Sequence, residues 1–144
     1  MAIIWEESPC GMLVRQLHLM LSKQTNNALR EQELTMPQLM ALLLLSRAEG
    51  NELSLKELER ALQTSQPDVA GVASRLTRKG MVDSFTDPQD KRMKRVRITE
   101  RGEACCRAAK DNMAQSEQAL LSKMSLAERQ MFCELLQKAV EGLR

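Results

Sequence analysis

Five cations fall within seven residues of this sequence, directly after a turn-forming segment, DPQD, at residues 87–90. They are Lys91, Arg92, Lys94, Arg95 and Arg97. The formal net charge of the 144-residue chain is only +2, so the cluster is a local feature and does not follow from a basic composition. Lysine and arginine at this density are suited to bind phosphate groups. A run of charges is also compatible with a plain solvated face, so the surrounding elements must decide between the two interpretations.

Side chains for catalysis or metal binding are scarce in the sequence. It has one histidine, His18, and four cysteines without CxxC spacing: Cys10, Cys105, Cys106 and Cys133. No nucleophile–base pair stands out, so we predict neither an enzyme, nor a metal site, nor a cofactor. The cysteines are expected to be free, buried thiols in a reducing compartment, with Cys10 partly buried and Cys133 in interface packing.

The apolar segments are too short for a membrane protein. The longest run, Leu39–Leu45, is far below the roughly 18 to 20 residues that a spanning helix needs. The first residues, MAIIWEESP, lack the basic region of a signal peptide. We therefore predict a cytoplasmic protein with no membrane partner.

Helices must supply most of the framework that positions the cations, because leucine and methionine are abundant and aromatic residues are few. Helical periodicity predicts helices over residues 9–31 and 36–48. Ser54 and Glu57 form a capping box at the start of a short helix, and a further helix runs from Ser65 to Gly80. Two more helices are expected, over about 100–122 and from Ser125 to the end.

The periodicity changes between residues 81 and 98. Residues 81–85 can form a strand, residues 87–90 carry turn chemistry, and Val96 and Ile98 alternate with arginines in a return strand. The cations therefore lie on a β-hairpin. The order of helix, short helix, turn, helix and hairpin predicts a mostly α-helical winged helix-turn-helix with a small hairpin wing.

In this architecture the helix from Ser65 enters the major groove of DNA. Its small exposed residues allow close approach, Gln66 can pair with adenine and Asp68 with cytosine, and Arg75 and Arg78 suit phosphates. The recognition-helix candidates are Ser65, Gln66, Pro67, Asp68, Ala70, Gly71, Ser74, Arg75 and Arg78. The wing candidates are Asp90, Lys91, Arg92, Lys94, Arg95 and Arg97, of which Lys94, Arg95 and Arg97 are expected to meet phosphates.

Three segments resemble the MarR family of transcription regulators, and the likeness extends over nearly the whole chain. LTMPQLMALLLL (34–45), SRLTRKGMV (74–82) and DPQDKRMKRVRITERG (87–102) are similar to that family's L-T-x-x-Q-x-x-x-L, D-R-L-x-x-K-G-L-V and D-x-x-D-x-R-x-x-x-V-x-L-T-x-x-G. The resemblance implies that Arg92 enters the minor groove and that Asp90 holds the wing by pairing with an arginine. This chain departs from the family at Pro67, Ala70 and Gly71, because the family often has polar residues along this exposed face. The resemblance therefore does not predict the operator sequence.

The resemblance also implies a homodimer. The expected division is a dimerisation region of residues 1–31 and 102–144 around a DNA-binding domain of residues 32–101. The last helix supports it, because its stripe of Phe132, Leu135, Leu136, Ala139, Val140 and Leu143 exceeds what one small core can cover. Trp5 is expected to pack on the partner subunit.

The function that follows is a sequence-specific DNA-binding transcriptional regulator. We expect a homodimeric repressor on a pseudo-palindromic operator, released by a small-molecule effector. Two alternatives stay open. A redox-sensing repressor would act through Cys10, as in a peroxide-sensing branch of the family, although that branch reads the oxidised sulfur with tyrosines and this chain has none. A winged-helix protein-interaction module is the other, against which the cationic wing argues.

Overall fold

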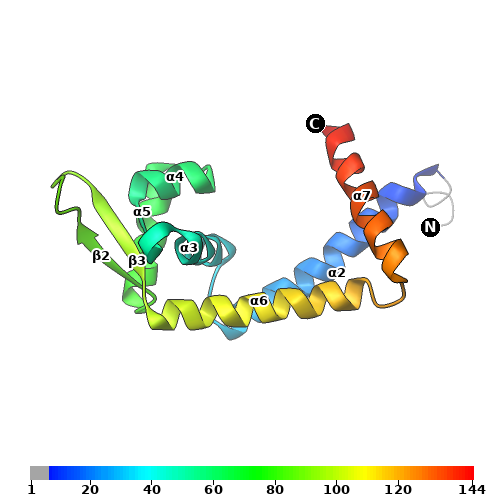
Figure 1. The fold of residues 1–144 in the computed structure, drawn as a ribbon, viewed down its shortest axis with the longest axis horizontal. Helices are drawn as coiled ribbons and strands as arrows, with labels where there is room; N and C mark the ends of the chain where they lie inside the picture. Colours follow the sequence, from blue (N-terminus) through cyan, green and yellow to red (C-terminus); the bar gives the residue numbers. More distant parts are fainter. Residues whose placement is uncertain (1–6) are drawn as a thin grey trace. The chain divides into compact units, whose positions relative to one another are not determined.

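The computed structural model describes residues 7–144 and confirms a mostly α-helical winged helix-turn-helix (Figure 1). Trp5 lies outside the described residues. In chain order the elements are α2 (Pro9–Glu31), α3 (Met36–Arg47), the 3-10 turn η1 (Glu49–Asn51), β1 (Glu52–Ser54), α4 (Leu55–Leu62), α5 (Gln66–Arg78), β2 (Val82–Thr86), β3 (Lys94–Ile98), α6 (Glu100–Leu120) and α7 (Leu126–Leu143). The chain forms two compact units, one ending at Asn112 and one of Met113–Arg144.

Side-chain caps fix where the helices begin. The two predicted capping boxes are present: Ser54 accepts from the Glu57 N–H (3.1 Å) ahead of α4, and Ser125 accepts from the Glu128 N–H (3.2 Å) ahead of α7. In each box the glutamate carboxylate accepts the backbone N–H of the serine in return. The sequence analysis missed a third box, in which Thr35 and Gln38 cap α3. The local signals of the sequence therefore set the starts of three helices.

The core of the first unit lies around α3, as its nearly all-apolar sequence predicts. Leu42 and Leu45 of α3 are fully buried, and they pack with the inner stripe of α5 and with the inward side chains of the hairpin. These inward residues are Val69, Val72, Ala73 and Leu76 of α5, Val82 of β2, and Val96 and Ile98 of β3. The core thus holds the recognition helix and the wing against one another.

A third strand extends the predicted hairpin. The antiparallel sheet has the order β1-β3-β2, with Glu52 opposite Arg97 and Val82 opposite Ile98. The sequence analysis expected only two strands, because β1 has three residues and no visible alternation. The consequence is that β3 has a neighbour on each side, and that its outward side chains meet residues from β1.

Lys79, at the C-terminal end of α5, joins this helix to the junction between α2 and α3. Its ammonium group donates to the backbone carbonyl of Glu33 and, at 3.1 Å, to Oε1 of Gln38. Gln38 is buried, and the same oxygen accepts the Thr35 N–H in the α3 capping box. The end of the recognition helix is therefore tied to the segment through which α2 continues into the winged-helix core.

Gly102, in the first turn of α6, contacts the base of the wing so closely that any side chain would require its neighbours to shift. A Cβ atom there would lie 2.3 Å from the Met81 carbonyl oxygen and 2.6 Å from Cγ1 of Ile98. That carbonyl also accepts the Thr99 N–H at 3.0 Å, so it cannot move away freely. We expect Gly102→Ala to lower the free energy of unfolding by about 1–3 kcal/mol, the usual cost of overpacking. Urea denaturation measures the change.

Gly11 provides the matched control for this prediction. It lies in α2, and a Cβ atom built there meets no atom within 4 Å. Alanine is favoured over glycine in a helix by about 1 kcal/mol, so Gly11→Ala is expected to be neutral or stabilising. Equal effects of the two substitutions would show that the close approach at Gly102 is not rigid.

Two helices carry apolar side chains that the single chain leaves open to solvent. Leu135 and Val140 of α7 are each 53% exposed, and no residue of α7 is buried. Leu19 and Met20 of α2 are also more than half exposed. Exposed apolar stripes on helices are characteristic of protein–protein contacts. Within residues 7–144, no helix is long and apolar enough to cross a bilayer.

Candidate nucleic-acid interface

The helix-turn-helix consists of α4, a tight turn and α5. Gln63 ends α4 in the left-handed conformation (φ 53°), and Ser65 caps α5 by accepting the Asp68 N–H at 3.4 Å. The hydroxyl of Thr64 donates to the Asp68 carboxylate at 3.3 Å. Asp68 therefore already has one partner within the turn, although its remaining lone pairs stay free to accept from a base.

The solvent face of α5 has the composition that the sequence analysis expected. Its buried stripe is turned into the core, and the predicted contact residues lie on the other side. Of these, Gln66, Pro67, Asp68, Ala70, Ser74, Arg75 and Arg78 are exposed, together with the cap Ser65, whereas Gly71 is half-buried. Because most of the side chains along this face are small, backbone and base edges can approach closely.

Backbone and aspartate hydrogen bonds close the tip of the wing. The Asp87 N–H donates to the Met93 carbonyl (2.8 Å), and the Met93 N–H donates to the Asp90 carbonyl (3.0 Å). The carboxylate of Asp90 accepts the Arg92 N–H at 3.0 Å. Lys91 and Arg92 are exposed at this tip. The turn thus holds the backbone at Arg92, while its guanidinium group points into solvent.

The expected pairing of Asp90 with an arginine is not present. An aspartate in a tight turn most readily reaches the N–H two residues further along, and Asp90 is used in this way. The wing carboxylate that contacts an arginine is Asp87, whose Oδ2 lies 3.6 Å from Nη1 of Arg95. Asp90 therefore shapes the wing through the backbone.

Strand alternation divides the wing cations into two sets. Lys94 belongs to the same face of β3 as the buried Val96 and Ile98, which is the face toward α5, whereas Arg95 and Arg97 belong to the opposite face. A hydrogen bond of 2.9 Å between the Thr77 and Ser84 hydroxyls also links α5 to β2. Lys94 therefore belongs to the sheet face toward the recognition helix, although Arg95 also lines a hollow of about 340 Å³ with Ser74 and Arg78 of α5.

A hollow of about 350 Å³ collects residues from three elements beside the recognition helix. It is lined by Arg92 and Lys94 of the wing, by Gln66 and Ala70 of α5, and by Lys56 at the start of α4. Lys56 was not among the residues expected from the sequence. Its place in the first turn of α4, two residues after the Ser54 cap, was the available signal, because the first turn of a helix presents free N–H groups as well as side chains. Three cations and this helix start converge on the hollow.

Arg95 and Arg97 have protein partners. Glu52 of β1 accepts from Nε of Arg95 (3.3 Å) through Oε1 and from Nε of Arg97 (2.9 Å) through Oε2, and the latter oxygen also contacts Nη2 of Arg97. The Arg97 guanidinium lies 5.0 Å from the centroid of the Phe85 ring. The hydrogen bond from Arg97 is the largest cause that lowers the pKa of Glu52; burial, the next largest, opposes it, and the charges of both arginines and the hydrogen bond from Arg95 lower the pKa further.

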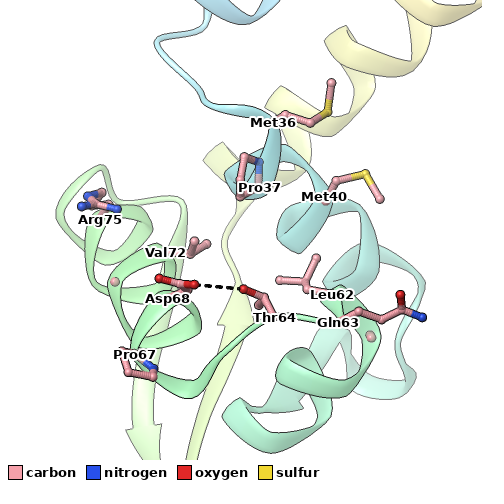
Figure 2. Close-up of a pocket in the computed structure, with 12 residues that line it drawn as sticks. Met36, Pro37, Met40, Leu62, Gln63, Thr64, Pro67, Asp68, Val72 and Arg75 are labelled. Carbon is pink, nitrogen blue, oxygen red and sulfur yellow. Dashed lines mark hydrogen bonds between the residues drawn. The ribbon is translucent and has the colours of Figure 1, made fainter.

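A further hollow, of about 620 Å³, lies between the start of α3, the α4–α5 turn and α5 (Figure 2). Met36, Pro37 and Met40 form one wall, and the recognition helix forms another. Its lining from α5 includes Pro67, Asp68, Gly71 and Arg75, which are also candidate DNA contacts. The lining is mostly apolar, with one cationic side chain, Arg75, and one carboxylate, Asp68, which suits a small organic molecule.

The cysteines differ in their exposure. Cys106 is buried and burial raises the pKa of its thiol, while Cys105 is half-buried. Cys10 and Cys133 are exposed on α2 and α7, the two helices whose apolar stripes are uncovered. Contrary to expectation, the single chain does not bury Cys10 even in part, and the packing of Cys133 in an interface stays a prediction. Among residues 7–144 no group of three or more histidine, cysteine, aspartate or glutamate side chains is arranged to hold a metal ion.

We expect peroxide treatment to leave the DNA affinity of the protein unchanged. Cys10 is exposed but lies on α2, away in sequence from the recognition helix, and the buried Cys106 is a weak nucleophile because its thiol is difficult to ionise. Binding isotherms before and after oxidation, for wild type and Cys10→Ser, measure the effect. A loss of binding in wild type that Cys10→Ser abolishes would establish the redox-sensing alternative.

The turn between α4 and α5, the open face of α5 and the adjacent wing define a winged helix-turn-helix protein of the kind that binds duplex DNA. The model of the MarR family matches residues 32–93. MepR of S. aureus, in a crystal structure with DNA, is 25% identical, with a TM-score of 0.77 over 93% of this chain and 99% of that chain. Over these residues the chain is similar to the MarR family, and its fold and helix-turn-helix are those of a DNA-binding transcriptional regulator of this type.

A second relative has been solved with a small molecule. The PcaV transcriptional regulator from Streptomyces coelicolor is 28% identical, with a TM-score of 0.76 over 92% of this chain and 96% of that chain. Its complex with its natural ligand is 27% identical, with a TM-score of 0.68 over 94% of each chain. The resemblance to this family, the fold class and the regulatory function expected from the sequence are thus confirmed, and the family it resembles is one of regulators and not of enzymes.

Proposed function

We propose that the protein is a homodimeric repressor that binds a pseudo-palindromic operator in the cytoplasm and leaves it when a small organic ligand binds. The observation that carries the proposal is the juxtaposition of the open face of α5 with the cationic tip of the wing. In this proposal α5 contacts base edges in the major groove, and the tip of the wing contacts the adjacent backbone and minor groove.

The dimer is supported by the exposed apolar stripes of α2 and α7. In this proposal residues 1–31 and 102–144 associate with a second copy, and residues 32–101 bind DNA. A two-fold axis through the dimer presents two copies of α5 to successive major grooves, which requires an operator with two inverted half-sites.

The DNA contacts divide by chemistry. Gln66, Asp68 and the small residues of α5 meet base edges, and Arg75 and Arg78 meet phosphates. Arg92 enters the minor groove, and Lys91 and Lys94 contact the flanking backbone. Lys56 joins them, because it lines the same hollow as Arg92 and Lys94 at the start of α4.

The effector site in this proposal is the hollow between α3 and α5. Four of its lining residues belong to the open face of α5, so an occupant would interfere with DNA at the helix that reads it. The ligand complex of PcaV supports an effector for this protein as well. Arg75 and Asp68 are the charged side chains of the lining that would pair with polar groups of the ligand.

Selection of duplexes from a random library by the wild-type protein tests the proposal. The most enriched sequence, hereafter the selected duplex, should contain inverted half-sites about 10 base pairs apart centre to centre. Its affinity should exceed that of a scrambled duplex and should fall steeply with salt. A protein-interaction module would enrich no sequence, and its weak binding would be the same for both duplexes.

A further inference from the structure

One carboxylate engages two of the five wing cations. Glu52 lies directly opposite Arg97 across the β1–β3 ladder, and each of its carboxylate oxygens accepts from a different arginine. Each arginine has a second partner as well, Asp87 for Arg95 and the Phe85 ring for Arg97. The guanidinium groups are therefore held on the sheet by two contacts each.

The other wing cations are differently placed. Within residues 7–144, Lys91, Arg92 and Lys94 form no ion pair, and all three are exposed. Of the two paired arginines, Arg95 keeps 21% of its side chain exposed and Arg97 keeps 55%. By strand alternation they belong to the face of β3 opposite Lys94, although Arg95 also lines a hollow with residues of α5. Within these residues, the wing cations are thus divided into three without an ion pair and two that Glu52 engages.

We propose that Glu52 is a positioning residue that determines specificity, by holding Arg95 and Arg97 on the sheet and out of sequence-independent phosphate contacts. The inference rests on the proposed function. Phosphate contacts add affinity for every sequence alike and carry no information about bases. A regulator must find one site among many competing sites. Cations that are kept from the DNA backbone lower its affinity for DNA of unrelated sequence, and thus reduce the competition from that DNA.

Binding to the operator depends less on the restraint of Arg95 and Arg97 by Glu52 than binding to unrelated DNA does. On the operator, base contacts of α5 and the groove contact of Arg92 fix the orientation of the wing. On other DNA no such contacts exist, and the protein binds in the orientation in which its free cations contact the most phosphates. Release of Arg95 and Arg97 should therefore strengthen binding to unrelated DNA more than binding to the operator.

Glu52→Gln tests the proposal, because glutamine keeps the shape of the side chain and removes its charge. On the scrambled duplex, the slope of log affinity against log salt should steepen by about 0.9 for each arginine that reaches a phosphate. For the scrambled duplex, the affinity at about 50 mM salt divided by the affinity at about 200 mM salt should then be larger in the variant than in wild type, by roughly 3.5-fold per arginine. The ratio of selected-duplex to scrambled-duplex affinity should fall. Glu49→Gln controls for net charge, because it removes the same charge at a position three residues before Glu52. The side chain of Glu49 is exposed and forms no ion pair within the described part of the chain.

Two further measurements separate release of the arginines from a general structural change. Adding Arg95→Ala and Arg97→Ala to Glu52→Gln should return the slope to the wild-type value. In the DNA-free protein, side-chain NMR should show slowly exchanging Nε–H groups for both arginines in wild type and rapid exchange in Glu52→Gln.

The possible failures are distinguishable. A wild-type protein that distinguishes the selected from the scrambled duplex, together with a Glu52→Gln variant of unchanged or shallower slope, would overturn the role of Glu52 and leave the proposed function standing. A wild-type protein that binds both duplexes equally would contradict the proposed function itself.

Discussion

Arg92→Ala is expected to weaken binding to the selected duplex by about 1–3 kcal/mol for each protomer, the usual scale of a good groove contact. The total approaches twice that value if the two sites of the dimer act independently. The structure supplies the reason, because the wing turn is closed by hydrogen bonds on both sides of Arg92 and its side chain is left free. A pre-organised guanidinium at a hairpin tip suits a narrow minor groove, where the potential is most negative. Binding isotherms on the selected and the scrambled duplex measure the loss.

Lys94→Ala is the matched control for Arg92→Ala. Lys94 belongs to the same wing and lines the same hollow, but its expected partner is a phosphate. Its removal should weaken both duplexes about equally and reduce the salt slope by about 0.9 per lost contact. If Arg92→Ala also weakened both duplexes equally, the tip would be no more than another backbone contact.

Val140→Glu is expected to convert the dimer to a monomer. In the proposed dimer this side chain is covered by the second copy, so a glutamate there would bury an unpaired charge twice, at a cost of several kcal/mol each. The dimerisation constant should fall by at least about 100-fold, and operator affinity should fall with it. Sedimentation at a series of concentrations measures the association, and circular dichroism tests whether the helices remain.

Lys138→Glu serves as the control for this substitution, since residue 138 lies two positions away and on another side of α7. It changes the charge by more than Val140→Glu does, yet it should leave the dimer intact. A stable dimer of Val140→Glu would mean that α7 does not form the interface, and the exposed stripe would then require another partner.

Local signals made most of the fold predictable. Ser54 and Ser125, each followed by glutamate three residues later, located two helix starts, and the bounds of α2 agree with those expected. The alternation of Val96 and Ile98 with arginines located β3. Each of these patterns extends over a few residues, and the hydrogen bonds that it specifies are formed within the same few residues.

The arrangement around Glu52 was not predictable in the same way. Glu52 meets Arg97 only because β1 pairs with β3, over a separation of 45 residues, and a three-residue strand leaves no periodicity in the sequence. The sequence shows five similar cations, but pairing across the sheet decides which of them are engaged. For the same reason Lys56 was missed, since only the folded chain brings α4 beside the wing.

The contact of Lys79 limits how the two reading helices of a dimer can adjust to DNA. Because its ammonium group bonds to the α2–α3 junction, α5 cannot swing alone unless this charge-assisted hydrogen bonding breaks. In the proposed dimer, a displacement of α2 would therefore carry α5 with it and change the separation of the two recognition helices. An operator whose half-sites are one base pair too close or too far apart would then have to break the Lys79 contacts or alter the packing of the two copies.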